Sequence, residues 1–460
     1  MQAFHMGALL EIFRYAAIIS GNNILISIIN FAAFLVMLNA LGTYGFGLLT
    51  LALSVLSVAT FFIELGFGRV IVSDVSKELH QNNMEQASGL FLGYIFFVLF
   101  STTLLAGMLF FFAGHVSAYF GKDLVLIIQL IAALVFLSGA KTVVSSAFHI
   151  VADFGKYASF LFADALSKLA LVYLFVTFIS GTVEAVLQAF IASGILTIAV
   201  FLFFIPKEIA EITRMRSNPW LFFEMAKRHG KWVAVFSQLR SIESSISPWI
   251  VEFFLGVNAV GIYGALTKVQ VLIIRVFEPL ETIFYPLVSR FGNFNDSRKI
   301  VFRATKYILF VSLPFIIAAV IFSEYILSVV LGQGFEKYAA VFMVLLLTVV
   351  IFILNMPMKP LFFNLKAQKS LTVISAVLLA STLALGSVLA FYFGLIGMAA
   401  NNVSTAFIDL SLKNRFMKKV SGEKYSIREM LFLDKADIDL AKKIFSDPKV
   451  ALAAFKRDAE

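Results

Sequence analysis

Long runs of apolar residues, separated by short polar connectors, follow one another along the chain. A helix crosses the hydrocarbon core of a membrane with about 20 mostly apolar residues, so these runs predict transmembrane helices. The connectors are short except for residues 206–231 and the tail that begins near residue 416. Twelve runs are recognisable, near residues 12–38, 42–66, 88–113, 123–148, 157–179, 182–205, 232–255, 260–287, 301–323, 338–363, 370–393 and 395–413.

The composition agrees with this pattern. Of the 460 residues, 60% are hydrophobic and 14% are charged, whereas soluble globular domains have about 25% charged residues. The sequence therefore predicts an all-α integral membrane protein with about 12 transmembrane helices. The first apolar run begins near Ile12 and continues past signal-peptide length, so a cleavable signal peptide is not expected. The chain has no cysteine, which excludes disulfides and thiolate metal sites.

The net charge of +9 is concentrated in the connectors on one side of the predicted membrane. With a cytoplasmic N-terminus, the connectors on that side carry sixteen lysines and arginines, whereas the opposite side has Lys122 and Lys337. Basic connectors favour the cytoplasmic side, so the asymmetry predicts that both termini are cytoplasmic. The positive charge is thereby explained without a nucleic-acid partner.

The two groups of six helices resemble each other. Similar segments recur in the same order, at offsets that drift only from 217 to 219 and then to 213 and 211. Because six is an even number, both copies have the same orientation, and the binding site is expected between them. The pairs are RYAAIIS (14–20) with KWVAVFS (231–237), GTYG (42–45) with GIYG (261–264), GYIFF (93–97) with KYILF (306–310), and SAYFG (117–121) with SVVLG (328–332).

These features divide the chain into four parts. In the tail, the segments IDLAKKIF and KVALAAFKR have the pattern of amphipathic helices that lie on a membrane surface. The segment GLFLG (89–93) fits a contact between small residues, which we expect to pack within the chain. The four parts are a six-helix lobe of residues 1–206, a basic cytoplasmic linker of residues 207–231, a second six-helix lobe of residues 232–415, and a cytoplasmic tail of residues 416–460.

The turns between the first two helices of each half carry a family resemblance. LGTYGFGLL (41–49), GVNAVGIYGALTKV (256–269) and the basic linker resemble the lipid-linked oligosaccharide (O-antigen) flippases. These belong to the superfamily of the multidrug and toxin extrusion (MATE) antiporters and the lipid II flippases. The resemblance covers about residues 10–415 and implies two parallel six-helix lobes in a V shape. Helices 1, 2, 7 and 8 would face a central cavity that opens alternately to each side of the membrane.

The stretch LIIRVFEPLETIFYPLVSR (272–290) places three charges, Arg275, Glu278 and Glu281, in an apolar helix. A charge at the bilayer centre costs about 2.5–3.5 kcal/mol and usually faces a bundle interior or a watery cavity. On a period of 3.6 residues, Lys268 and Arg275 fall within about 20° of each other and Glu278 about 60° away, so these three residues form a polar stripe on one side of the helix. Arg275 is too far from either helix end for easy snorkelling, so a polar cavity is the favoured explanation. If the chain is a lipid-linked oligosaccharide flippase, we expect Arg275 and Lys268 to bind the pyrophosphate group of the lipid carrier.

Other polar side chains lie in the predicted spans, and each has a structural alternative. Lys141 can snorkel to the interface, and Asp164 with Lys168 can form a pair that fixes helix packing. Arg240 is expected to pair with Glu278 or Glu281 in a cytoplasmic-side gate, which is structural or functional. As substrate-binding candidates we add Lys141, Lys168, Asn22, Asn23 and Asn30, the asparagines for sugar hydroxyls or for helix packing. The gate and ion-coupling candidates are Arg240, Glu243, Glu278, Glu281 and Asp164.

Three functions compete. The first is a flippase for a polyprenyl-pyrophosphate-linked oligosaccharide in the bacterial inner membrane, which serves surface polysaccharide assembly. Its partners are membrane lipid and other polysaccharide-assembly membrane proteins. The second is a small-molecule multidrug antiporter of the same fold, for which a cavity dominated by carboxylates and aromatic residues is expected. The third is a polysaccharide polymerase or ligase, which the short outward loops disfavour. No P-loop or H-E-x-x-H motif occurs and the histidines are scattered, so no cofactor, metal or catalytic residue is predicted.

Overall fold

The structure is a computed structural model. It describes residues 2–432 except 121–123, 216, 230, 291–293, 366 and 423–427. The described residues form helices joined by short turns, and no strand occurs among them. The N-terminal half contains α1 (Gln2–Glu64), α2 (Gly68–His80), α3 (Met84–Phe111), α4 (Ala113–Phe120), α5 (Val125–Ile150), α6 (Phe154–Phe178), α7 (Val183–Leu202), α8 (Lys207–Arg214) and α9 (Trp220–His229).

The C-terminal half has the same kind of organisation. Its long helices are again separated by short ones at the turns. They are α10 (Lys231–Leu255), α11 (Val257–Arg290), α12 (Phe294–Ile321), α13 (Ser323–Leu331), the 3₁₀ turn η1 (Glu336–Tyr338), α14 (Ala339–Asn355), α15 (Met358–Asn364), α16 (Gln368–Ser421) and α17 (Arg428–Leu431).

Two glycines turn single helices into pairs of spans. α1 reverses at Gly42, where φ is 63°, and α16 reverses at Gly394, where φ is 56°. A side chain is strained at such positive φ values, whereas glycine adopts them freely. Within the described residues, nine helices are long and apolar enough to span a membrane. Because α1 and α16 each supply two spans, these nine helices account for eleven of the twelve predicted spans. The twelfth predicted span, residues 232–255, coincides with α10.

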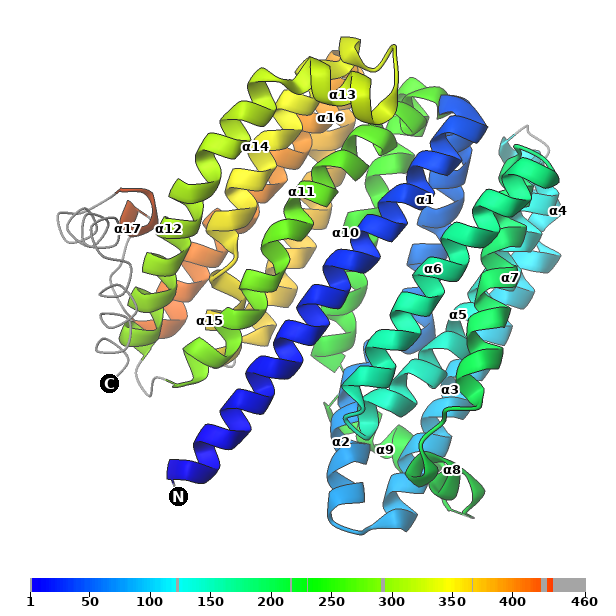
Figure 1. The fold of residues 1–460 in the computed structure, drawn as a ribbon, viewed down its shortest axis with the longest axis vertical. Coiled ribbons are helices and arrows are strands. Elements are labelled where there is room, and N and C mark those ends of the chain that lie inside the picture. The colour runs from blue at the N-terminus through cyan, green and yellow to red at the C-terminus, as the bar shows by residue number, and fades with distance from the viewer. Residues whose placement is uncertain are drawn as a thin grey trace.

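The spans form two bundles, seen right and left in Figure 1. In the first bundle, α3, α5, α6 and α7 pack against one another and against α1. In the second, α10, α11, α12, α14 and α16 pack together. The end of the molecule that carries α4 and α13 is called the upper end, and the end that carries α2, α8 and α9 is the lower end (Figure 1). α1 connects the bundles because it contacts α6 on one side and α10 and α11 on the other.

The structure shifts one of the sequence alignments between the halves. The second half turns at Gly256, where φ is 84°, in the place that Gly42 occupies in the first half. GIYG (261–264) therefore lies inside α11 and not at the turn where the alignment with GTYG puts it. The residues that occupy equivalent positions five residues beyond the two turns are Gly47 and Gly261. This register brings two glycines to the same level of the molecule.

The linker between the halves is folded against the first bundle. α8 buries Ile209 and Ile212, and α9 buries Phe222 against aromatic residues of α3. A Cβ added at Gly93 would lie 2.3 Å from the carbonyl oxygen of Pro219. The small residues of GLFLG thus pack within the chain, as the sequence predicts, and their partners are residues 218–222, which lead into α9 and form its first turn.

The last span is longer than its apolar run. α16 continues to Ser421, and Gly422 ends it in the left-handed conformation with φ 71°. Beyond it, α17 packs on α12, where Met430 is fully buried and Glu429 forms an ion pair with Arg298. The two amphipathic tail segments predicted at 438–445 and 449–457 lie outside the described residues.

Candidate functional site

The lower half of α11 carries the polar stripe that the sequence predicts. Arg275 lies far from both ends of this helix, and 48% of its side chain is exposed. Its guanidinium donates a hydrogen bond of 2.6 Å to Oε2 of Glu278, three residues further along. Contact of this arginine with lipid would cost several kcal/mol, so its exposure favours the water-facing position that the sequence predicts.

Lys268 differs from its neighbours on the stripe. It is exposed, and among the described residues no carboxylate lies within ion-pair distance of its Nζ. The charges that act on it belong to Arg275 on the same helix and to Lys168 on α6 of the other bundle. Lys168 also lies over the ring of Phe190, 5.4 Å from the ring centroid. Cations of both bundles are therefore gathered at one level of the molecule.

Asp164 is the anionic centre of the first bundle. Its two oxygens form ion pairs with Lys141 of α5 and, at 3.5 Å, with Lys168 one turn further along α6. The predicted pairing of Asp164 with Lys168 is confirmed. Lys141, for which snorkelling was the alternative, reaches this carboxylate and ties α5 to α6. One carboxylate thus serves two cations, which leaves the cluster with a net positive charge.

Of the three candidate asparagines of α1, one packs against a neighbouring helix and two have exposed side chains. Asn22 donates a hydrogen bond of 3.0 Å from Nδ2 to the carbonyl oxygen of Ala158, which joins α1 to α6. Asn23 and Asn30 are exposed. The packing alternative therefore describes Asn22, whereas the side chains of Asn23 and Asn30 are available to a ligand.

The expected pairing of Arg240 with Glu278 or Glu281 is wrong in this conformation. Arg240 pairs with Glu243 on its own helix at 3.2 Å. Glu278 is occupied by Arg275, which is nearer because it lies one turn away on the same helix. Glu281 forms its ion pair with Lys359 of α15 at 3.4 Å.

A polar cluster in the second bundle escaped the sequence analysis. Lys413 of α16 forms an ion pair of 2.7 Å with Asp409, and Asn355 of α14 donates a hydrogen bond of 3.1 Å to the same carboxylate. Glu243 of α10 lies close enough for its charge to interact with both charged residues. An aspartate and a lysine four residues apart in an apolar span are the same signal that revealed Asp164 and Lys168.

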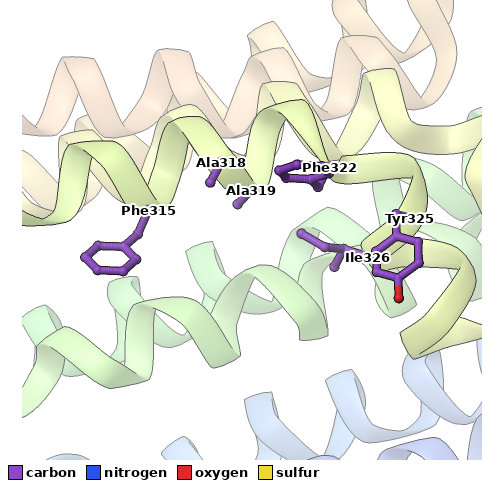
Figure 2. Close-up of a pocket in the computed structure, with 6 residues that line it drawn as sticks. All are labelled: Phe315, Ala318, Ala319, Phe322, Tyr325 and Ile326. Carbon is purple, nitrogen blue, oxygen red and sulfur yellow. The ribbon is translucent and has the colours of Figure 1, made fainter.

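An apolar pocket in the second bundle is unrelated to these charges. Its lining residues belong to α12 and α13 (Figure 2). Its volume is about 710 Å³. Its lining is almost wholly apolar, and Phe315 and Phe322 are mostly exposed. Such a surface suits the acyl chains of a bilayer and offers nothing to an anion. The residues that line it are Phe315, Ala318, Ala319, Phe322, Tyr325 and Ile326.

Comparison with known proteins gives one family and one fold. The family described as "Polysaccharide biosynthesis protein" matches residues 36–340, which is more than half of the chain. No curated protein sequence matches the chain.

Solved structures share the fold at low sequence identity. An inward-facing multidrug resistance MATE family transporter of the MOP superfamily has a TM-score of 0.69 at 14% identity, over 89% of this chain and 100% of that one. The lipid II flippase MurJ in an inward closed conformation has a TM-score of 0.68 at 15% identity, over 92% of each chain. An outward-facing MATE family transporter has a lower TM-score of 0.60 at 12% identity, over 89% of this chain and 97% of that one.

Proposed function

This chain belongs to the polysaccharide biosynthesis protein family, and we propose that it flips a prenyl-pyrophosphate-linked oligosaccharide across the bacterial inner membrane. The family description supports a role in polysaccharide assembly. The shared fold supports transport, because the similar structures include a lipid II flippase and multidrug transporters. The observation that carries the proposal is Lys268, an exposed cation with no carboxylate partner among the described residues, beside Arg275 on the stripe of α11.

A diphosphate is the ligand chemistry that fits these cations. It cannot cross hydrocarbon unless its charge is compensated, and cations with access to water at mid-membrane provide that compensation. A guanidinium offers a planar fork that binds two phosphate oxygens, and an ammonium adds a compact charge beside it. Lys168 supplies a third cation from the opposite lobe. The diphosphate would then bridge the two lobes.

Glu278 has a defined part in this cycle. In the structure it holds Arg275 at 2.6 Å, which limits the cost of an unpaired charge when no substrate is bound. When the diphosphate arrives, it competes with Glu278 for the guanidinium. When the diphosphate leaves, Glu278 takes its place. This exchange keeps binding reversible, as transport requires.

The remaining candidates follow from their positions. The exposed amides of Asn23 and Asn30 on α1 can donate hydrogen bonds to sugar hydroxyls, whereas Asn22 and Lys141 hold helices together. The lobes, residues 1–206 and 232–415, would rock about α1 in an alternating-access cycle. In that cycle Arg240 and Glu281 change partners near the cytoplasmic side, together with Glu243.

The orientation of the molecule can be tested with single cysteines, since the chain has none of its own. We expect a membrane-impermeant maleimide to label Lys337→Cys from outside intact cells. Arg214→Cys in α8 should be labelled only after permeabilisation, because basic connectors stay in the cytoplasm. External labelling at Arg214→Cys would reverse the orientation and contradict the proposed direction of transport.

The fold alone also fits a small-molecule multidrug antiporter. The charges argue against it, since an exposed lysine next to an exposed arginine repels a cationic drug. Loss of the gene is expected to make lipid-linked repeat units accumulate on the cytoplasmic side of the membrane, with no change in drug resistance. Drug sensitivity without such accumulation would favour the antiporter.

A further inference from the structure

The two lobes meet backbone to backbone at their upper ends. A Cβ added at Gly47 of α1 would lie 2.1 Å from the carbonyl oxygen of Val257 and 2.9 Å from the nitrogen of Gly261. A Cβ added at Gly261 of α11 would lie 1.8 Å from the carbonyl oxygen of Thr43. Real Cβ atoms essentially never approach other atoms closer than 3.0 Å, so this crossing admits glycine alone on both sides.

The crossing is symmetric between the halves. Gly47 follows the turn at Gly42 by five residues, and Gly261 follows the turn at Gly256 by the same number. At the same interface, Oγ1 of Thr43 donates a hydrogen bond of 2.5 Å to Oδ1 of Asn258. Each half thus presents an equivalent glycine to the other, as expected where a duplicated chain closes on itself.

Contacts between the lobes change in character away from this level. Further down, Ser57 of α1 accepts a hydrogen bond of 3.0 Å from Ser245 of α10, through side chains. On α11, Val271 lies at about the level of Ser57 and Arg275 lies one turn lower, and both are exposed. In α1, Ala33 and Phe34 above are buried, whereas most described side chains of residues 21–30 are exposed or half-buried. The lobes are therefore sealed at the upper end and accessible from the lower end.

We propose that the Gly47–Gly261 crossing is the outer gate of the transport cycle, closed in this conformation and opened by separation of the two lobes at this level. Flat backbone surfaces separate without the side-chain repacking that interdigitated helices need. They are held by close van der Waals contact and by the hydrogen bond between Thr43 and Asn258. The gate therefore seals tightly and still opens at low cost. The direction of the gate rests on the proposed function.

The design predicts an asymmetric effect of added bulk. A methyl group at Gly47 or Gly261 prevents the lobes from meeting, but it does not hinder their separation. Alanine at either position should therefore shift the population toward the outward-open state. Alanine at Gly107 of α3 is the matched control, because a Cβ there would meet nothing within 4 Å.

The test uses Val271→Cys as a single reporter on the exposed stripe of α11, read by the rate of labelling with an impermeant maleimide from outside. Gly47→Ala and Gly261→Ala are each expected to raise this rate about tenfold, the effect of about 1.4 kcal/mol on the closed state. Gly107→Ala should leave the rate unchanged. If an alanine variant does not insert, Asn258→Ala replaces it, since it removes the hydrogen bond without adding bulk and should also raise the rate.

A second arm needs no transported substrate. In membranes, oxidation of the double variant Thr43→Cys/Asn258→Cys should form a disulfide, measured by loss of maleimide-reactive thiol, and Gly47→Ala should slow its formation. The rate of disulfide formation measures closure of the gate and does not depend on which substrate the protein transports. Equal labelling and equal disulfide rates in Gly47→Ala, Gly261→Ala and Gly107→Ala would overturn the gate.

Discussion

Replacement of Arg275 by alanine is expected to reduce transport to near background, with normal expression and membrane insertion. A hydrogen bond to a charged group contributes about 1.5–3 kcal/mol. Loss of one such bond between Arg275 and the diphosphate lowers the affinity about tenfold to hundredfold, and loss of both bonds of a bidentate contact lowers it further. Removal of a charge from the middle of a span eases insertion. The measurement is the amount of surface polysaccharide in cells that express the variant at wild-type level.

Two further variants separate the role of the guanidinium from packing. Arg275→Lys should recover only part of the activity, because an ammonium keeps the charge but loses the planar fork. Val276→Ala is the matched control, since Val276 is the next residue and 62% of it is exposed. Normal polysaccharide with Arg275→Ala would show that this arginine serves packing.

Replacement of Asp164 by asparagine is expected to destabilise the folded protein more than the other single substitutions proposed for the charged site. Asp164 is the shared partner of Lys141 and Lys168, and its side chain is only 19% exposed. Removal of one partner of a buried ion pair costs about 3–5 kcal/mol, and the partial exposure here reduces that figure. The detergent-solubilised variant should therefore melt at a lower temperature than the wild type.

A double variant tests the physical reason for this loss. In Asp164→Asn, both Lys141 and Lys168 lose their carboxylate partner. The double variant Lys141→Met/Asp164→Asn also removes one of these two buried charges, so it should be more stable than Asp164→Asn alone. If Asp164→Asn keeps the wild-type melting temperature but loses transport, the aspartate acts in the transport cycle and not in packing.

The spans were predictable because lipid imposes one requirement on each of them, a long apolar stretch. The short helices α2 and α8 were not, since they lie outside the spans and are too short and too polar for the same signal. The equivalence of Gly42 with Gly256 was also hidden. It depends on which glycine adopts a positive φ, whereas the sequence match between GTYG and GIYG compares letters only.

The candidate site was predictable as a set of residues but not as a set of pairs. Pairs within one helix follow from spacing, as Asp164 with Lys168 shows. Pairs between helices depend on rotation and depth, which spacing does not contain. For that reason Lys359 as the partner of Glu281, and Lys141 as a second partner of Asp164, appear only in the structure.

Flipping of a lipid-linked oligosaccharide by the purified protein in liposomes measures the proposed activity itself. The probe is a polyprenyl-diphosphate-linked oligosaccharide with a fluorescent sugar, and the readout is its accessibility to a membrane-impermeant quencher. Wild-type protein and Val276→Ala should move the probe between leaflets, whereas Arg275→Ala should resemble empty liposomes. A wild-type protein that left the probe where it was added would contradict the proposed flippase activity, and Arg275→Ala moving the probe as fast as the wild type would contradict the role of Arg275.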